Sequence, residues 1–237
     1  MKNIIKKIPL LNTIATYLYI KLSSLFCKFE GSEKYWETRY RLDGNSGDGS
    51  YDNLCAFKAD VLNSFVKERA IEYVIEFGCG DGNQLKYAAY PSYLGLDVSS
   101  TIIRKCQALF ANDVSKVFKL MNDYSAEKAP LSLSLDVIYH LVEDDTFNAY
   151  MRTLFQSSTR YIIIYSSNTD MQQKIQAPHV KHRKFSDWVA AHFPEWVLME
   201  HKKNKFPYSE KDQTGSFADF YIYENKSTPE DVSKLFN

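Results

Sequence analysis

Cysteine is scarce in this 237-residue chain, and its placement argues against two classes of protein. The four cysteines, Cys27, Cys55, Cys79 and Cys106, are widely spaced and form no C-x-x-C pair. A disulfide framework or a structural zinc site uses paired or clustered cysteines, so neither is expected. The chain therefore fits a reducing, cytoplasmic compartment.

An excess of charge of either sign is also lacking. Lys and Arg total 29, Asp and Glu total 29, and the formal net charge is zero. Such a chain has no overall field that would attract a polyanion. It also lacks a basic, aromatic-rich extra domain of the kind that binds nucleic acid. We expect no nucleic-acid partner.

A long uninterrupted hydrophobic run is the third absence. The apolar stretch 8–26 includes Asn12, Lys21 and Ser23 and is too polar for a spanning helix. Residues 1–30 instead predict an amphipathic helix, because apolar residues recur every three or four positions: Ile4, Ile8, Leu11, Ile14, Leu18, Leu22 and Leu25. This face can pack on the protein itself, form a homodimer, or lie peripherally on the inner face of a membrane.

The rest of the chain alternates between apolar strand patterns and helical patterns. Strands are predicted at 72–77, 92–97, 117–121, 133–139 and 161–166, and helices at 84–89, 99–110 and 144–156. Such alternation is typical of a parallel α/β sheet. Two later strands, 196–201 and 217–223, have no helix between them and should pair as an antiparallel hairpin. We predict a Rossmann-like, doubly wound seven-stranded sheet with an N-terminal helical extension.

The strongest local signal is the segment VIEFGCGDG at 74–82. A buried strand ends at Glu76, and Gly78, Gly80 and Gly82 follow at every second position before a predicted helix. Glycines let the backbone turn tightly and approach a ligand, and a helix N-terminus offers free N–H groups. A second strand ends at Asp97, where a carboxylate can accept hydrogen bonds from a ribose.

This E-x-G-x-G-x-G motif with a strand-end Asp resembles the signature of class I S-adenosylmethionine-dependent methyltransferases. The resemblance covers about residues 70–224 and implies S-adenosyl-L-methionine as cofactor. It places these residues at the cofactor: Tyr35, Trp36, Arg39, Glu76, Gly78, Gly80, Gln84, Asp97, Val98, Asp123, Tyr124 and Tyr139. A nicotinamide-dependent oxidoreductase is the alternative, but its G-x-G-x-x-G motif has a different spacing and Glu76 would repel a pyrophosphate. A non-catalytic methyltransferase-like subunit would show an eroded glycine motif.

Four segments are predicted along the chain: the helix 1–30, a helical lid with a Gly/Ser loop at 31–70, the core at 71–225 and a tail at 226–237. In the lid, Tyr35 or Trp36 would cover the adenine or the sulfonium, and Arg39 would bind the cofactor carboxylate. A helix that packs its aromatic residues on the core explains the same pattern. Asp123 would contact the adenine amino group, unless it only forms a turn.

The acceptor site is predicted from two loops. His140 follows the fourth strand, and a basic loop at 178–184 follows the fifth. His140 and His182 are candidate bases, while His179 and Arg183 would bind an anionic or hydroxyl-bearing acceptor. Glu143, Asp144 and Asp145 are read as an acidic first turn of a helix in preference to a metal site.

The order of these motifs resembles methyltransferases of bacterial surface-polysaccharide (O-antigen or capsule) gene clusters. That resemblance implies O-methylation of a sugar or a sugar-linked phosphate. The absence of an N-P-P-Y-like tetrapeptide after the fourth strand argues against methylation of adenine or glutamine amino groups. Another small-molecule acceptor is the alternative.

Overall fold

The computed structural model describes residues 29–174, 176–209 and 214–227. Nearly all of the predicted N-terminal helix (1–28) and most of the predicted tail (228–237) lie outside the described residues. Within the described ranges, no helix is both long enough and apolar enough to cross a membrane.

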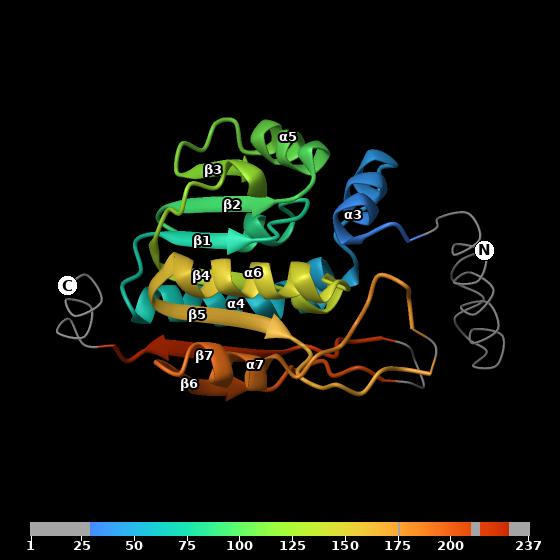
Figure 1. The fold of residues 1–237 in the computed structure, drawn as a ribbon. Helices are drawn as coiled ribbons and strands as arrows, with labels where there is room; N and C mark the ends of the chain where they lie inside the picture. The colour runs from blue at the N-terminus through green and yellow to red at the C-terminus, as the bar shows by residue number, and fades with distance from the viewer. Residues whose placement is uncertain (1–28, 175, 210–213, 228–237) are drawn as a thin grey trace.

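One seven-stranded sheet organises the molecule. Five strands run parallel: β1 (Val74–Phe77), β2 (Tyr93–Asp97), β3 (Lys116–Leu120), β4 (Ala129–Leu135) and β5 (Ser158–Ser166). The last two, β6 (Trp196–Lys202) and β7 (Asp219–Asn225), form an antiparallel pair, and β7 lies beside β5. The spatial order is β3-β2-β1-β4-β5-β7-β6 (Figure 1). The predicted fold class is confirmed. The strand order reverses between β1 and β4, where open α/β sheets bind ligands.

Helices cover both faces of the sheet. They are α4 (Asp52–Glu68), α5 (Ser100–Leu109), α6 (Asp144–Ser157) and α7 (Phe185–His192), and a fifth helix, α3 (Ser32–Arg41), lies apart from the faces. Residues of α4 and α5 belong to one buried cluster, and residues of α6 and α7 to a second. Helix α3 belongs to neither cluster and stands beyond the carboxyl ends of β1 and β2 (Figure 1).

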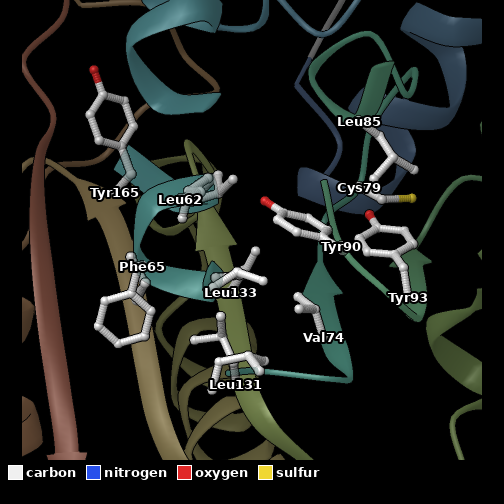
Figure 2. Close-up of a cluster of buried hydrophobic side chains, with 14 of the residues drawn as sticks. Leu62, Phe65, Val74, Cys79, Leu85, Tyr90, Tyr93, Leu131, Leu133 and Tyr165 are labelled. Carbon is white, nitrogen blue, oxygen red and sulfur yellow. The ribbon is translucent and has the colours of Figure 1, made fainter. Parts of the chain in front are cut away.

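Neighbouring residues of a strand belong to different buried clusters, because their side chains point to opposite faces of the sheet. Val74 faces the α4 side and Ile75 the α6 side, and Tyr161 and Ile162 divide in the same way. Adjacent side chains of a strand point to opposite faces, so a strand covered by helices on both faces is apolar throughout. Figure 2 shows the α4-side cluster, in which Phe65 packs beside the strands.

The fourth strand begins and ends earlier than the sequence predicts. We predicted it at 133–139, where the apolar run is densest, but β4 spans Ala129–Leu135. The strand ends because Asp136 adopts a left-handed conformation with φ 60°. Its polar members are buried with partners, since Ser132 hydrogen-bonds Ser157 and Ser134 accepts a hydrogen bond from Tyr150.

The helix predicted at 84–89 is also different. Only one 3₁₀ turn, Gln84–Tyr87, follows the glycine loop. The expected array of free N–H groups at a long helix N-terminus is therefore missing here. The ends of α5 and α6 agree with the predicted ranges 99–110 and 144–156 to within one residue.

Candidate active site

The glycine loop after β1 is held by contacts that leave no room for side chains. Gly78 and Gly80 have φ values of 83° and 56°, in the left-handed region that favours glycine. A Cβ on Gly78 would lie 2.4 Å from Val137 Cγ2, and one on Gly80 would lie 2.4 Å from Ser46 Oγ. The glycines thus let the loop pass under the Gly/Ser segment as well as approach a ligand.

Glu76 is a buried carboxylate at the end of β1. Its Oε2 accepts a hydrogen bond of 2.6 Å from the Tyr93 hydroxyl. Burial raises the pKa of Glu76 to about 7, against the opposing effects of the Tyr93 hydrogen bond and the Lys58 charge. The carboxyl of Glu76 is therefore poised between its two protonation states near pH 7. It lines a cavity, and a cation bound beside it there would favour the ionised form.

Asp97 ties the end of β2 to the glycine loop. One carboxylate oxygen accepts the Gly80 N–H at 3.1 Å, and the other accepts the Ser99 N–H at 2.9 Å. Burial raises the pKa of Asp97 to about 6, although both backbone hydrogen bonds oppose the shift. These two bonds leave lone pairs on the carboxylate, which also lines the cavity.

Glu76, Gly78, Gly80 and Asp97 all border one cavity of about 910 Å³. That volume is at the upper end of the range for small-molecule sites, roughly 300–1,000 Å³. Gln84, Val98 and Trp36 also line it, as predicted cofactor residues should. Gln84 donates its amide N–H to the Cys55 carbonyl, but within the described part of the chain nothing donates to its buried Oε1.

The turn after β3 contributes other residues to the cavity than the sequence predicts. Asn122 and Met121 line the cavity, whereas Asp123 borders a separate shallow hollow beside α5. The 3₁₀ turn Met121–Asp123 causes this, because successive side chains there point about a third of a turn apart. Tyr124 does not line the cavity: it packs on Phe77 and donates to the Glu127 carbonyl.

Helix α3 closes the cavity and is held at two points. In the middle of the helix, Glu37 accepts hydrogen bonds of 2.6 Å from the Ser99 and Thr101 hydroxyls at the start of α5. At the start of α3, Ser32 donates to the Glu143 carboxylate through its N–H (2.9 Å) and its hydroxyl (2.7 Å). The helix therefore bridges the α5 side and the α6 side of the cavity.

The aromatic residues of α3 have separate positions. Trp36 lines the cavity and contacts His140 edge-on at 4.9 Å, while Tyr35 stacks on His179 at 4.1 Å outside the lining. Arg39 does not line the cavity either, since it binds Asn45 and the Tyr35 hydroxyl and lies 5.5 Å over the Trp36 ring. Arg39 supports the Trp36 wall and is not placed to bind a cofactor carboxylate.

Of the predicted acceptor-side residues, only His140 lines the cavity. Its Nδ1 contacts the His179 carbonyl at 3.0 Å, and because a carbonyl only accepts, Nδ1 carries the proton and Nε2 the lone pair. Burial lowers the pKa of His140 to about 4, so the ring is neutral near pH 7. His182 is buried against Ser167, 2.7 Å away, and does not border the cavity.

The basic loop is fastened to α6 by ion pairs. Arg183 binds Asp144 at 2.7 Å and donates to the Leu141 and Val142 carbonyls, and Lys181 binds the same carboxylate at 2.6 Å. These contacts occupy four of the five Arg183 donors, and Arg183 does not line the cavity. Among the residues described, no cluster of three metal-ligating side chains occurs at the 143–145 segment or elsewhere.

Sequence reasoning missed a buried ion pair at the cavity wall. Lys58, on α4, is 1% exposed, and its Nζ donates to Asp136 Oδ2 at 2.7 Å. The other Asp136 oxygen accepts the Tyr139 hydroxyl at 2.8 Å, so Tyr139 supports this carboxylate and does not itself line the cavity. Asp136 lies within the predicted fourth strand, 133–139, and nothing in the periodicity of α4 distinguishes Lys58 from a surface lysine.

Comparisons with known proteins support the fold. The sequence matches no protein-family model and no curated protein. Among solved structures, it is similar to the N-methyltransferase NodS of Bradyrhizobium japonicum WM9 in complex with S-adenosyl-L-homocysteine. That match has a TM-score of 0.65 at 12% identity and covers 84% of this chain and 100% of NodS.

Two further structures share the fold. Magnesium protoporphyrin IX methyltransferase (ChlM) of Synechocystis PCC 6803, with bound S-adenosylmethionine, has a TM-score of 0.58 at 13% identity, covering 82% of this chain and 97% of ChlM. The CurJ carbon methyltransferase has a TM-score of 0.54 at 10% identity, covering 75% of this chain and 57% of CurJ. The chain therefore has the Rossmann-like fold of these methyltransferases.

Proposed function

We propose that this protein is a methyltransferase that uses S-adenosyl-L-methionine and acts on a small-molecule acceptor. The observation that carries the proposal is the convergence of Glu76, the glycine loop and Asp97 on one large cavity beneath α3. The structural neighbours named above support it, because two of them hold S-adenosylmethionine or its demethylated product on the same fold.

Each part of the cofactor has a suitable partner in this cavity. Glu76 and the unpaired Oε1 of Gln84 suit the cationic amino group of the methionine part. Asp97 suits the ribose hydroxyls, and Asn122 the adenine edge. When bound, S-adenosylmethionine supplies a methyl group on a positively charged sulfur. The protein's contribution is to align the methyl group with the acceptor, exclude water under Trp36, and stabilise charge.

The sugar or sugar-phosphate acceptor implied by the sequence resemblance has less support. It came from the order of motifs, and of the predicted acceptor-side residues His140 lines the cavity whereas His179, His182 and Arg183 do not. The acceptor must instead be inferred from the side chains that do line it.

Isothermal titration tests cofactor binding directly. We expect S-adenosylmethionine and S-adenosylhomocysteine to bind with micromolar dissociation constants, a binding free energy of about 8 kcal/mol. NADH should neither bind with similar affinity nor compete for the site. Gly80→Val should abolish binding, because its side chain would collide with Ser46 and displace the loop. Circular dichroism should show that this variant is folded. Tight NADH binding without a response to S-adenosylmethionine would refute the proposal.

A further inference from the structure

The cavity carries an excess of negative charge, although the whole chain is neutral. Its lining holds seven carboxylates and three cations: Glu30, Glu33, Glu37, Glu76, Asp97, Asp136 and Glu143 against Lys34, Arg41 and Lys58. Glu37 and Glu143 are bound by hydroxyl and backbone N–H groups, which satisfy their hydrogen bonds without cancelling their charge. A phosphate or carboxylate entering here would meet repulsion on several sides.

The nearby basic loop adds no cation to the lining, although the charge of Arg183 acts on Glu143. Lys181 and Arg183 pair with Asp144, and Lys184 pairs with Asp187. None of these three cations lines the cavity. The loop therefore fastens itself to α6 and α7 and leaves the cavity acidic.

Asp136 is the carboxylate best placed for an acceptor. It follows the carboxyl end of β4, at the edge of the sheet where ligands of open α/β folds bind. Its φ of 60° is a strained conformation for a residue other than glycine, of the kind found at functional sites. Each of its oxygens has one hydrogen bond in the structure, from Lys58 or Tyr139, and a carboxylate can accept about four.

Aromatic surfaces and further acceptors lie in the same cavity. Trp36 and His140 contact each other and both line it, and the charge of Asp136 acts on the His140 ring. An indole face attracts cations. The Nε2 of His140 offers a lone pair, because its Nδ1 carries the proton. These groups offer hydrogen-bond acceptors and π-electrons, and they suit a ligand that brings N–H donors.

We propose that the methyl acceptor is an amine, held by Asp136 beside Trp36 and His140. This inference rests on the proposed methyltransferase function and names the acceptor class of the same site. The amine binds as its ammonium ion and loses one proton to solvent before transfer. Its lone pair forms the new N–C bond while the S–C bond breaks, and the electrons of that bond stay on sulfur. Positive charge passes from sulfur to nitrogen, and the methylated nitrogen then releases one proton to solvent.

The charges favour nitrogen over oxygen as the attacking atom. A carboxylate beside the nucleophile stabilises the positive charge that develops on nitrogen during transfer. A hydroxyl must instead lose its proton to a base, and His140 is a weak one because burial lowers its pKa to about 4. Asp136, Glu76 and Asp97 would also repel an alkoxide.

Three fragments with the same aromatic body and different head groups test the proposal: benzylamine, benzyl alcohol and benzyl phosphate. The protein is first saturated with S-adenosylhomocysteine, and fragment affinities are measured by ligand-observed NMR at pH 7.5 and low salt. The benzylammonium ion should bind about tenfold more tightly than benzyl alcohol, the effect of one charge-assisted hydrogen bond. Benzyl phosphate should bind most weakly.

Variants assign the preference to Asp136. Asp136→Asn and the double variant Lys58→Met/Asp136→Asn should both lose the tenfold preference; the double variant avoids a buried, unpaired lysine. Asp145→Asn removes the same charge from the exposed start of α6 and should keep the preference. The proposal is overturned if the three fragments bind alike or not at all, if benzyl phosphate binds best, or if both Asp136 variants keep the preference. If S-adenosylhomocysteine itself fails to bind, the proposed function fails first.

Discussion

Individual charged residues in this protein sit in surroundings that oppose their charge. Glu76 and Asp97 are buried carboxylates with raised pKa values, and Lys58 is a buried cation paired with Asp136. The two buried carboxylates cost free energy in the folded protein when they are ionised, and a cationic ligand would offset part of that cost. The raised pKa values therefore point to the same ligand charge as the lining of the cavity.

The cost of Glu76 should appear as a pH-dependent stability. The pKa of its carboxyl rises from 4.5 to about 7 on folding. Between these values the folded protein holds a proton that the unfolded chain has released, so stability falls as pH rises through this window. Above pH 7 the loss reaches roughly 3 kcal/mol.

Glu76→Gln should remove that loss, and its amide oxygen can still accept the Tyr93 hydrogen bond. Urea unfolding of the ligand-free proteins should show the variant more stable than wild type at pH 8 and nearly equal to it at pH 5. The same variant should bind S-adenosylmethionine more weakly. An unchanged gap between the two proteins at pH 5 and pH 8 would show that Glu76 does not titrate in this window.

At the scale of elements, patterns of burial were easier to predict than ends and turns. The strands of the sheet centre were recognised because residues buried on both faces are continuously apolar. β4 was misplaced because its serines, Ser132 and Ser134, look like surface residues although they are buried with partners. The turn after the glycines was predicted as a helix because its length and apolar spacing fit both.

Helix α3 should act as a lid whose closure depends on a few polar contacts. Only Ser32 and Tyr40 of this helix are buried, so its packing contributes little to the core. Glu37→Ala removes the contacts to Ser99 and Thr101 and should loosen α3 where it meets the start of α5. We expect S-adenosylhomocysteine to dissociate roughly tenfold faster, since side-chain hydrogen bonds to a charged group contribute about 1.5–3 kcal/mol.

Stopped-flow dissociation measures this rate, and hydrogen exchange at residues 32–41 should rise in the same variant while the melting temperature changes little. Asp60→Ala, which removes an exposed carboxylate from α4, is the matched control and should leave both unchanged. Unaltered exchange at α3 in Glu37→Ala would mean that the helix is held by other contacts.

At the scale of the whole molecule, the sequence allowed the fold and the cofactor side to be predicted better than the acceptor side. The glycine loop, Glu76 and Asp97 are adjacent to strands whose order follows from the pattern, so their convergence could be expected. The acceptor side depends on which way side chains of long loops and helices turn. Arg183 and Lys181 turn towards Asp144, and Lys58 turns inwards from α4. No periodicity encodes those choices.

The excess of carboxylates in the cavity leads to a final prediction, which rests on the proposed cofactor. S-adenosylmethionine and S-adenosylhomocysteine share the adenosine, ammonium and carboxylate groups, and differ by the methyl group and the positive charge on sulfur. The ratio of their dissociation constants therefore reports how strongly the cavity favours that charge.

Raising the pH from 5 to 8 ionises Asp97 and Glu76, whose pKa values are about 6 and about 7 in the free protein. The preference for S-adenosylmethionine should thus increase with pH, by about tenfold at low salt, and shrink when salt is added. Titration calorimetry at both pH values measures the ratio, with Asp60→Asn as the control for surface charge. A ratio that stays constant or falls between pH 5 and pH 8 would show that these carboxylates do not act on the sulfonium.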